Sequence, residues 1–223
     1  MMTQRRFRIG AIHALANAIP TTQAAFDRVW PEADVAHLLD GSLYLDRDLG
    51  TADEEELTAR IERLARYSAS TGTEAVIVTG SFFGAAAKQA RASVSIPVST
   101  SFDGIIERAL AFNGPLHVLS TAPDSSTLLV EELEREAESG NRNITVSRQA
   151  VAGALDALIG GDADQHDRLV LAAVEAVDPG TAILFAQFSM ERILERSADA
   201  HSDPVIGPAS EGVARLRDML TQQ

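Results

Sequence analysis

The sequence predicts an α/β protein made of two similar halves, each with its own parallel sheet. Three observations lead to this prediction. Short runs of β-branched residues alternate with helical stretches along the 223 residues. Landmarks of the first half recur in the second half at a nearly constant spacing. Apolar strands end in hydroxyl-rich turns that lead directly into helices, which is where α/β proteins bind ligands.

Eight short apolar runs are predicted to form strands. They are Phe7–His13, Asp34–Leu39, Ala75–Thr79, Pro97–Thr100, Leu116–Ser120, Ile144–Arg148, Ala182–Ala186 and Pro204–Ile206. Helices are expected between them, and the clearest covers Asp53–Ser70, with acidic residues in its first turn. Its residues Leu57, Ile61, Leu64 and Ala65 share one apolar face. Gly72 then provides a stop.

Three pairs of landmarks repeat along the chain. They are Gly80 with Gln187 and Pro97 with Pro204, both 107 residues apart, and His13 with Thr121, 108 residues apart. One recurring offset indicates two pseudo-symmetric Rossmann-like halves. An unrelated α/β protein in which three offsets agree by chance is the alternative.

The halves are predicted to cover residues 1–104 together with 204–223, and residues 105–203. The helix Ala209–Leu220 is expected to return to the first half, because the strand at Pro204 resembles the strand at Pro97. A duplicated α/β pair usually binds its ligand in the cleft between domains, at the carboxyl ends of the strands. We therefore expect an inter-domain cleft to hold the ligand.

Composition excludes several classes of function. A formal net charge of −13 and a pI near 4.7 argue against nucleic acids and anionic membranes as partners. The start MMTQRRF leads into a strand without an apolar segment, and no apolar run reaches about 18 residues. We therefore expect neither a signal peptide nor a membrane span, and a cytoplasmic protein. The absence of cysteine excludes disulfides, thiolate metal sites and thiol nucleophiles.

Cofactor motifs are also missing. The histidines show no metal-ligand spacing with carboxylates, so no metal site is predicted. The sequence contains no G-x-G-x-x-G, no phosphate-binding G-x-x-x-x-G-K-[ST] and no G-x-S-x-G nucleophile turn. We expect no cofactor.

The stretch VIVTGSFFGAAAKQAR, from Val76 to Arg91, predicts a strand, a tight turn and a helix. Thr79, Ser81 and the backbone N–H groups at the helix start suit an anion such as a carboxylate. The loop STAPDSST, from Ser120 to Thr127, and Ser189 offer further hydroxyls. In each loop the competing interpretation is helix capping, by Ser81, by Asp124 or Ser125, and by Ser189.

His13 ends the first predicted strand, inside the expected inter-domain cleft. Its pKa range suits proton transfer near neutral pH. The competing interpretation is a hydrogen-bonded structural histidine.

The motifs VIVTGSFFGAAAKQAR, ILFAQFSMERI and LLDGSLYLD, together with the duplicated plan, resemble the aspartate/glutamate/hydantoin racemase superfamily, which includes maleate isomerases and arylmalonate decarboxylases. The resemblance implies two facing cysteines that move the α-proton of a substrate. Here Gly80 and Gln187 stand at those two positions. Neither side chain can act as a thiol acid or base, so a two-thiol racemase is disfavoured.

Two functions follow from this combination. The first is a cofactor-independent isomerase, decarboxylase or other lyase acting on a small carboxylate or cyclic amide, with His13 transferring the proton and Ser81 and Gln187 fixing the carboxylate. The second is a non-catalytic protein that binds a small carboxylate. The remaining predicted contacts to the ligand are Thr79, Gly80, Phe82, Thr121, Phe188 and Ser189. The resemblance also implies a possible homo-oligomer.

Overall fold

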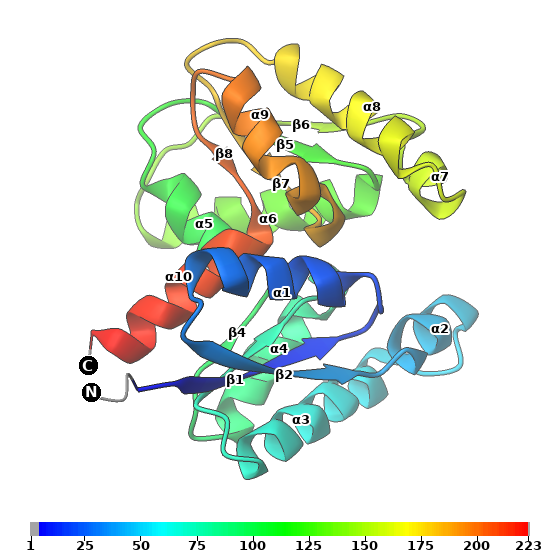
Figure 1. Ribbon diagram of the computed structural model, residues 1–223, viewed down its shortest axis with the longest axis vertical. Helices are drawn as coiled ribbons and strands as arrows, with labels where there is room; N and C mark the ends of the chain where they lie inside the picture. Colours follow the sequence, from blue (N-terminus) through cyan, green and yellow to red (C-terminus); the bar gives the residue numbers. More distant parts are fainter. Residues whose placement is uncertain (1–4, 223) are drawn as a thin grey trace. The chain divides into compact units, whose positions relative to one another are not determined.

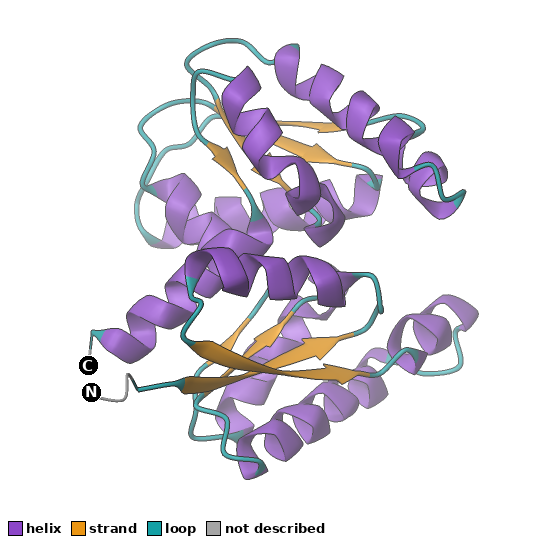
Figure 2. Cartoon of the chain, viewed as in Figure 1, coloured by secondary structure: helices purple, strands orange, loops and turns teal. Residues whose placement is uncertain are grey.

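The computed structural model describes residues 5–222, and its contacts divide the chain into two compact units. The first unit contains the residues up to Gly104 and those from Gly212 onward, and the second unit runs from Ile105 to Glu211. Each unit has one sheet with helices on its faces (Figure 2). The α/β class predicted from the alternating pattern is confirmed.

The first unit contains a parallel sheet with the strand order β2-β1-β3-β4. Its elements in chain order are β1 (Phe7–His13), α1 (Ala18–Val29), β2 (Ala33–Leu39), α2 (Ser42–Leu49), α3 (Glu54–Ser70), β3 (Ala75–Val78), the 3₁₀ turn η1 (Ser81–Phe83), α4 (Gly84–Ala90), the 3₁₀ turn η2 (Arg91–Ser93) and β4 (Val98–Ser99). The chain moves from β1 to β2 in one direction and from β2 to β3 in the other. Right-handed connections therefore place α1 and α3 on opposite faces of the sheet, as Figure 1 shows.

The second unit repeats this plan with the strand order β6-β5-β7-β8. Its elements, from the helix that leads into it, are α5 (Asp103–Leu110), β5 (Leu116–Ser120), α6 (Pro123–Ser139), β6 (Val146–Ala150), α7 (Ala154–Ile159), α8 (Ala163–Glu175), β7 (Ala182–Phe185), the 3₁₀ turn η3 (Phe188–Ile193), α9 (Leu194–Ala200), β8 (Val205–Ile206) and α10 (Pro208–Thr221). The two strand orders correspond element by element. The duplicated plan inferred from the repeated spacing is confirmed.

One assignment differs from the expectation. The sequence placed residues 204–223 in the first half, but β8 pairs with β7, and the N–H of Ile183 donates to the carbonyl oxygen of Pro204 at 2.9 Å. The strand at Pro204 is the counterpart of the strand at Pro97, and each belongs to the sheet of its own unit. The last helix does return to the first unit as expected, because α10 belongs to that unit from Gly212 onward.

Local signals explain the helix that the sequence predicts best. The Asp53 side chain caps α3 by accepting the N–H of Glu56 at 2.9 Å, and three glutamates fill the first turn. Leu57, Ile61 and Ala65 are buried on one face. Gly72 follows the helix with φ +81°, a left-handed conformation that glycine adopts at little cost.

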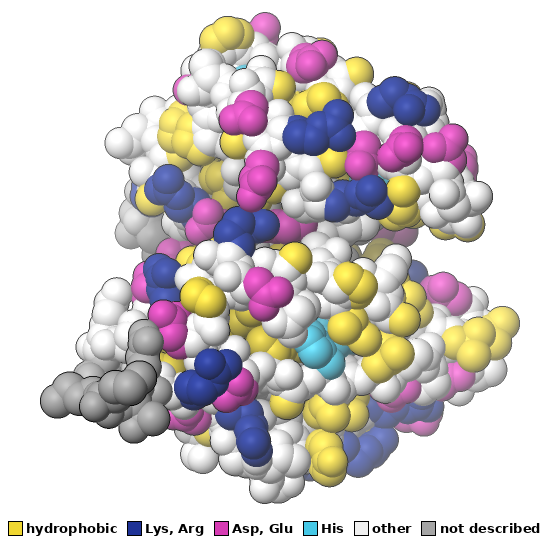
Figure 3. All heavy atoms as spheres, viewed as in Figure 1, with side chains coloured by type: hydrophobic (Ala, Val, Ile, Leu, Met, Phe, Trp, Pro, Cys, Tyr) yellow, Lys and Arg dark blue, Asp and Glu magenta, His cyan; other side chains and the backbone are white. Residues whose placement is uncertain are grey.

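The visible surface carries mixed charge. On the face shown in Figure 3, acidic and basic side chains are interspersed rather than gathered into a basic stripe. Exposed apolar side chains include Leu45 and Leu49 on α2. Within residues 5–222, no helix combines the length and apolar character needed to cross a membrane.

Gly10 lies in the middle of β1 at a point with no room for a side chain. A Cβ atom there would lie 2.0 Å from Oγ of Ser68 and 3.2 Å from Cγ2 of Val76. We expect Gly10→Ala to lower the free energy of unfolding by about 1–3 kcal/mol, through overpacking. Gly41→Ala is the matched control, since no atom lies within 4 Å of its Cβ position, and it should stay within about 0.5 kcal/mol of the parent. Urea denaturation measures both, and equal stabilities would contradict the packing account.

Candidate functional site

The turn after β3 holds four of the predicted site residues. Thr79 and Gly80 follow the last residue of the strand, and Ser81 and Phe82 begin η1. Gly80 has φ −90° and ψ 118°, an extended conformation open to any residue. A Cβ atom at Gly80 would nevertheless lie 2.8 Å from Cδ2 of Phe83 and 3.7 Å from the Tyr44 hydroxyl oxygen. The ring of Phe83, rather than the backbone, therefore favours glycine at this position.

Tyr44 on α2 brings a phenol to this turn. Its hydroxyl is hydrogen bonded to the Ser81 side chain and to the backbone of Phe82. Burial raises the pKa of Tyr44, and the nearby Arg47 cation opposes this effect. The phenol therefore keeps its proton at neutral pH and can donate it. Among the described residues no side chain caps η1 or α4, so Ser81 contacts Tyr44 instead of capping the helix.

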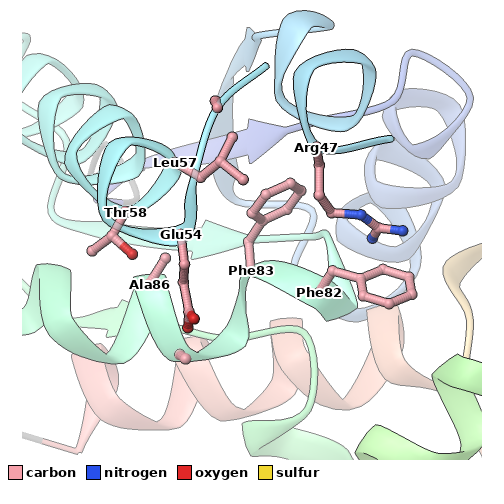
Figure 4. Close-up of a pocket in the computed structure, with 9 residues that line it drawn as sticks. Arg47, Glu54, Leu57, Thr58, Phe82, Phe83 and Ala86 are labelled. Carbon is pink, nitrogen blue, oxygen red and sulfur yellow. The ribbon is translucent and has the colours of Figure 1, made fainter. Parts of the chain in front are cut away.

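A pocket of about 270 Å³ adjoins the same turn (Figure 4). The guanidinium of Arg47 lies 3.8 Å from the centroid of the Phe82 ring and 5.2 Å from that of Tyr44. The other lining residues are Ala52, Glu54, Leu57, Thr58, Phe83, Ala85 and Ala86. Phe82, predicted as a ligand contact, thus lines this pocket next to Ser81 in the chain.

His13 lies at the end of β1 with both ring nitrogens engaged. Nδ1 lies 3.0 Å from Oγ1 of Thr79, and Nε2 lies 2.9 Å from Nδ1 of His37 on β2. The His13 side chain is fully buried, while Thr79 retains 6% exposure. Burial, followed by the neighbouring His37, lowers the pKa of His13 to about 4. His13 is therefore neutral at physiological pH.

In the second unit, hydrogen bonds link the segments that follow β5 and β7. Oε1 of Gln187, just after β7, accepts the N–H of Thr121 at 2.5 Å, the hydroxyl of Thr121 at 2.9 Å and the N–H of Ala122 at 3.3 Å. These donors stand at the start of α6, where the helix dipole favours an electronegative atom. The amide oxygen of Gln187 is thus committed inside the protein, and its NH₂ group is the part suited to donate to a ligand.

The expected capping by Asp124, Ser125 or Ser189 is not seen, since within the described chain no side chain caps α6 or η3 from its own first turn. Phe188 is buried and Ser189 is partly exposed. No group of three or more His, Cys, Asp or Glu residues suited to a metal occurs among residues 5–222.

Several side chains at these sites were not predicted from the sequence. His37, Gln23 and Asp27 extend the contacts of His13, and Tyr44 and Arg47 surround the turn after β3. The spacing of Gln23 and Asp27, four residues apart on α1, and the position of Tyr44 within LLDGSLYLD were the available signals. Neither signal showed which strand end these side chains would reach.

Comparison with known proteins identifies the family that has this architecture. The family model described as Asp/Glu/Hydantoin racemase matches residues 14–216. The chain belongs to this family. A search of curated proteins gave no match.

Solved structures with the racemase-family fold include an allantoin racemase from Klebsiella pneumoniae, with a TM-score of 0.71 and 15% identity over 97% of this chain and 88% of that chain. A glutamate racemase from Bacillus anthracis has a TM-score of 0.67 and 14% identity, covering 98% and 83% of the two chains. An aspartate racemase homologue from Pyrococcus horikoshii OT3 has a TM-score of 0.67 and 12% identity, covering 96% and 99%. At these identities the likeness shows the fold.

Within this racemase family, the chain is distinguished by what stands at the two positions where the resemblance expects thiols. Gly80 and Gln187 occupy them, and the sequence contains no cysteine. Phe83 fills the space beside Gly80, and Gln187 binds the start of α6.

A thiol restored at position 80 must displace the Phe83 ring. We expect Gly80→Cys to lower the free energy of unfolding by about 1–3 kcal/mol, because the new Cβ would lie 2.8 Å from that ring. The double variant Gly80→Cys/Phe83→Leu should be less destabilised than the sum of the two single variants. A double-mutant cycle by urea denaturation measures this coupling. Strict additivity would show that the ring does not restrict position 80.

The lowered pKa of His13 predicts a loss of stability in acid. The His13 ring takes up a proton near pH 6.5 in the unfolded chain and only near pH 4 in the folded chain. The contribution of this group to the free energy of unfolding is therefore complete above pH 6.5 and is lost as the pH falls toward 4. The loss from this group is up to about 3 kcal/mol. In His13→Gln the decline of unfolding free energy between pH 7 and 4.5 should be shallower. Parallel pH profiles for the two proteins would refute the assignment.

Proposed function

We propose that this protein binds a small carboxylate or cyclic amide and acts as a divergent, cofactor-independent isomerase or lyase without the two-thiol mechanism. The racemase-family fold supports the general class. The specific ligand class is supported by the groups that end the central strands of each unit.

The observation that carries the proposal is the set of donors around Gln187. Two backbone N–H groups and one hydroxyl converge on a single amide oxygen at the start of a 17-residue helix. An oxygen with partial negative charge already occupies this position, so its environment suits a carboxylate or amide oxygen. In the first unit, Ser81 and Tyr44 add two hydroxyls at the corresponding strand end.

The chemistry favoured is one that does not begin with removal of a carbon-bound proton. His13 is fully buried, so it cannot contact a carbon atom of the ligand directly, and neither glycine nor glutamine supplies a base for that step. Loss of CO₂ from a dicarboxylate needs only stabilisation of the resulting enediolate and a proton for the carbon. The protonated phenol of Tyr44 and the hydroxyl of Ser81 beside it are the available donors.

A non-catalytic carboxylate-binding protein is the second candidate. It is favoured by the replacement of both thiol positions with residues that do no acid/base chemistry. Turnover separates the two candidates. If the protein is an enzyme, a panel of malonate, maleate and hydantoin contains a substrate whose conversion is lost in Tyr44→Phe. If it only binds carboxylates, these compounds raise the melting temperature without being converted.

Substitutions of Gln187 test the carboxylate site directly. We expect Gln187→Ala to enlarge the melting-temperature increase produced by malonate, because the donors at Thr121 and Ala122 become free for the ligand. Gln187→Glu should abolish that increase, since its own carboxylate takes their place. Gln149→Ala on the exposed strand β6 is the matched control and should respond like the parent. Identical malonate responses in all four proteins would overturn the carboxylate site.

A further inference from the structure

A continuous chain of hydrogen bonds runs from the end of β3 to the surface of α1. Oγ1 of Thr79 lies 3.0 Å from Nδ1 of His13, and Nε2 of His13 lies 2.9 Å from Nδ1 of His37. Nε2 of His37 lies 3.0 Å from Oε1 of Gln23, whose Nε2 group donates to the exposed Asp27 carboxylate at 2.7 Å. All five side chains belong to the first unit.

The carboxylate at the far end fixes the direction of every bond. Because a carboxylate only accepts, the NH₂ group of Gln23 must face Asp27, and its carbonyl oxygen must face His37. The Nε2 atom of His37 then carries the proton, and its Nδ1 atom accepts.

The same logic continues to the end of β3. Nε2 of His13 donates to His37, which leaves a lone pair on Nδ1 of His13 facing the Thr79 hydroxyl. The carbonyl oxygen of Ile12 is an alternative acceptor for that hydroxyl, at 3.4 Å. Donation to Ile12 would leave two lone pairs facing each other at 3.0 Å, so donation to His13 is preferred.

A hydroxyl, a base in hydrogen-bond contact with it and a third group that orients the base form the arrangement of an activated nucleophile. His13 is fully buried, so it reaches a ligand only through Thr79. We propose that Thr79 is a nucleophile that accepts an acyl group from an activated ester or cyclic amide, with His13 as its base and His37, Gln23 and Asp27 as positioning residues. This activity goes beyond the proposed function and does not depend on it.

The step balances within the groups present. Oγ1 of Thr79 forms a bond to the carbonyl carbon, and its proton moves to Nδ1 of His13. The bond from that carbon to the leaving oxygen or nitrogen breaks, and the proton passes to the leaving group. Water then attacks the acyl-Thr79 ester, giving its proton to His13, and Thr79 is released with the proton returned to its oxygen.

Acylation by p-nitrophenyl acetate tests the nucleophile. The parent should release p-nitrophenolate with an acetyl group on Thr79, located by peptide mass spectrometry. Thr79→Val should abolish this label, and His13→Gln should slow it by about 10²-fold or more. Thr73→Val is the matched control, since this buried hydroxyl contacts only Ser68 in the described hydrogen bonds, and it should label like the parent. Label on Ser81 or Lys88 with Thr79 unmodified would overturn the proposal.

A second measurement covers variants that fail to fold. In ¹⁵N-resolved NMR of the unmodified protein, His13 and His37 should each carry the proton on Nε2 and none on Nδ1. Asp27→Asn, which replaces an exposed carboxylate, lets the Gln23 amide adopt either orientation. It should mix the tautomers and slow acetylation several-fold. Protonated Nδ1 on His13 in the parent, or an unchanged labelling rate in Asp27→Asn, would contradict the positioning role.

Discussion

The buried ring of His13 is the constraint around which the first unit is arranged. A polar ring removed from water needs partners for both nitrogens, and those partners must come from neighbouring elements. Thr79 just after β3 supplies one, and His37 on β2 supplies the other. The ends of three adjacent strands are thereby held at fixed positions. The surrounding apolar packing keeps the ring neutral, which in turn sets what chemistry it can perform.

The two units use different side chains to link the ends of their central strands. In each sheet the two central strands are linked by a side-chain hydrogen bond at their carboxyl ends. It joins His13 and Thr79 in one unit and Thr121 and Gln187 in the other. The first contact presents a hydroxyl with a base behind it. The second presents an oxygen held by backbone donors. Duplication has therefore conserved the fold while the polar groups of the halves have diverged in role.

Fold and site differ in how much of them the sequence reveals. All eight strands lie where the β-branched runs indicate, because such apolar runs form strands that are buried in a sheet. The repeated spacing predicted that the two sheets share one topology. The assignment of Pro204 failed because a spacing cannot say to which sheet a strand belongs. The positions of His13, Thr79 and Gln187 at strand ends could be predicted from the sequence. Their partners Tyr44, His37 and Gln23 were not, since which side chains meet depends on register and packing between elements distant in sequence.

The packing of Phe83 against Gly80 limits which residues this chain can accept at position 80. The backbone at residue 80 accepts any amino acid, so a single codon change could write cysteine there. The ring of Phe83 makes a cysteine at residue 80 destabilising unless a smaller side chain replaces the ring. A cysteine at residue 80 therefore fits better when a smaller side chain stands at residue 83. The residue types that positions 80 and 83 tolerate are thus coupled, and an aromatic ring beside the turn limits which catalytic side chains could be introduced there.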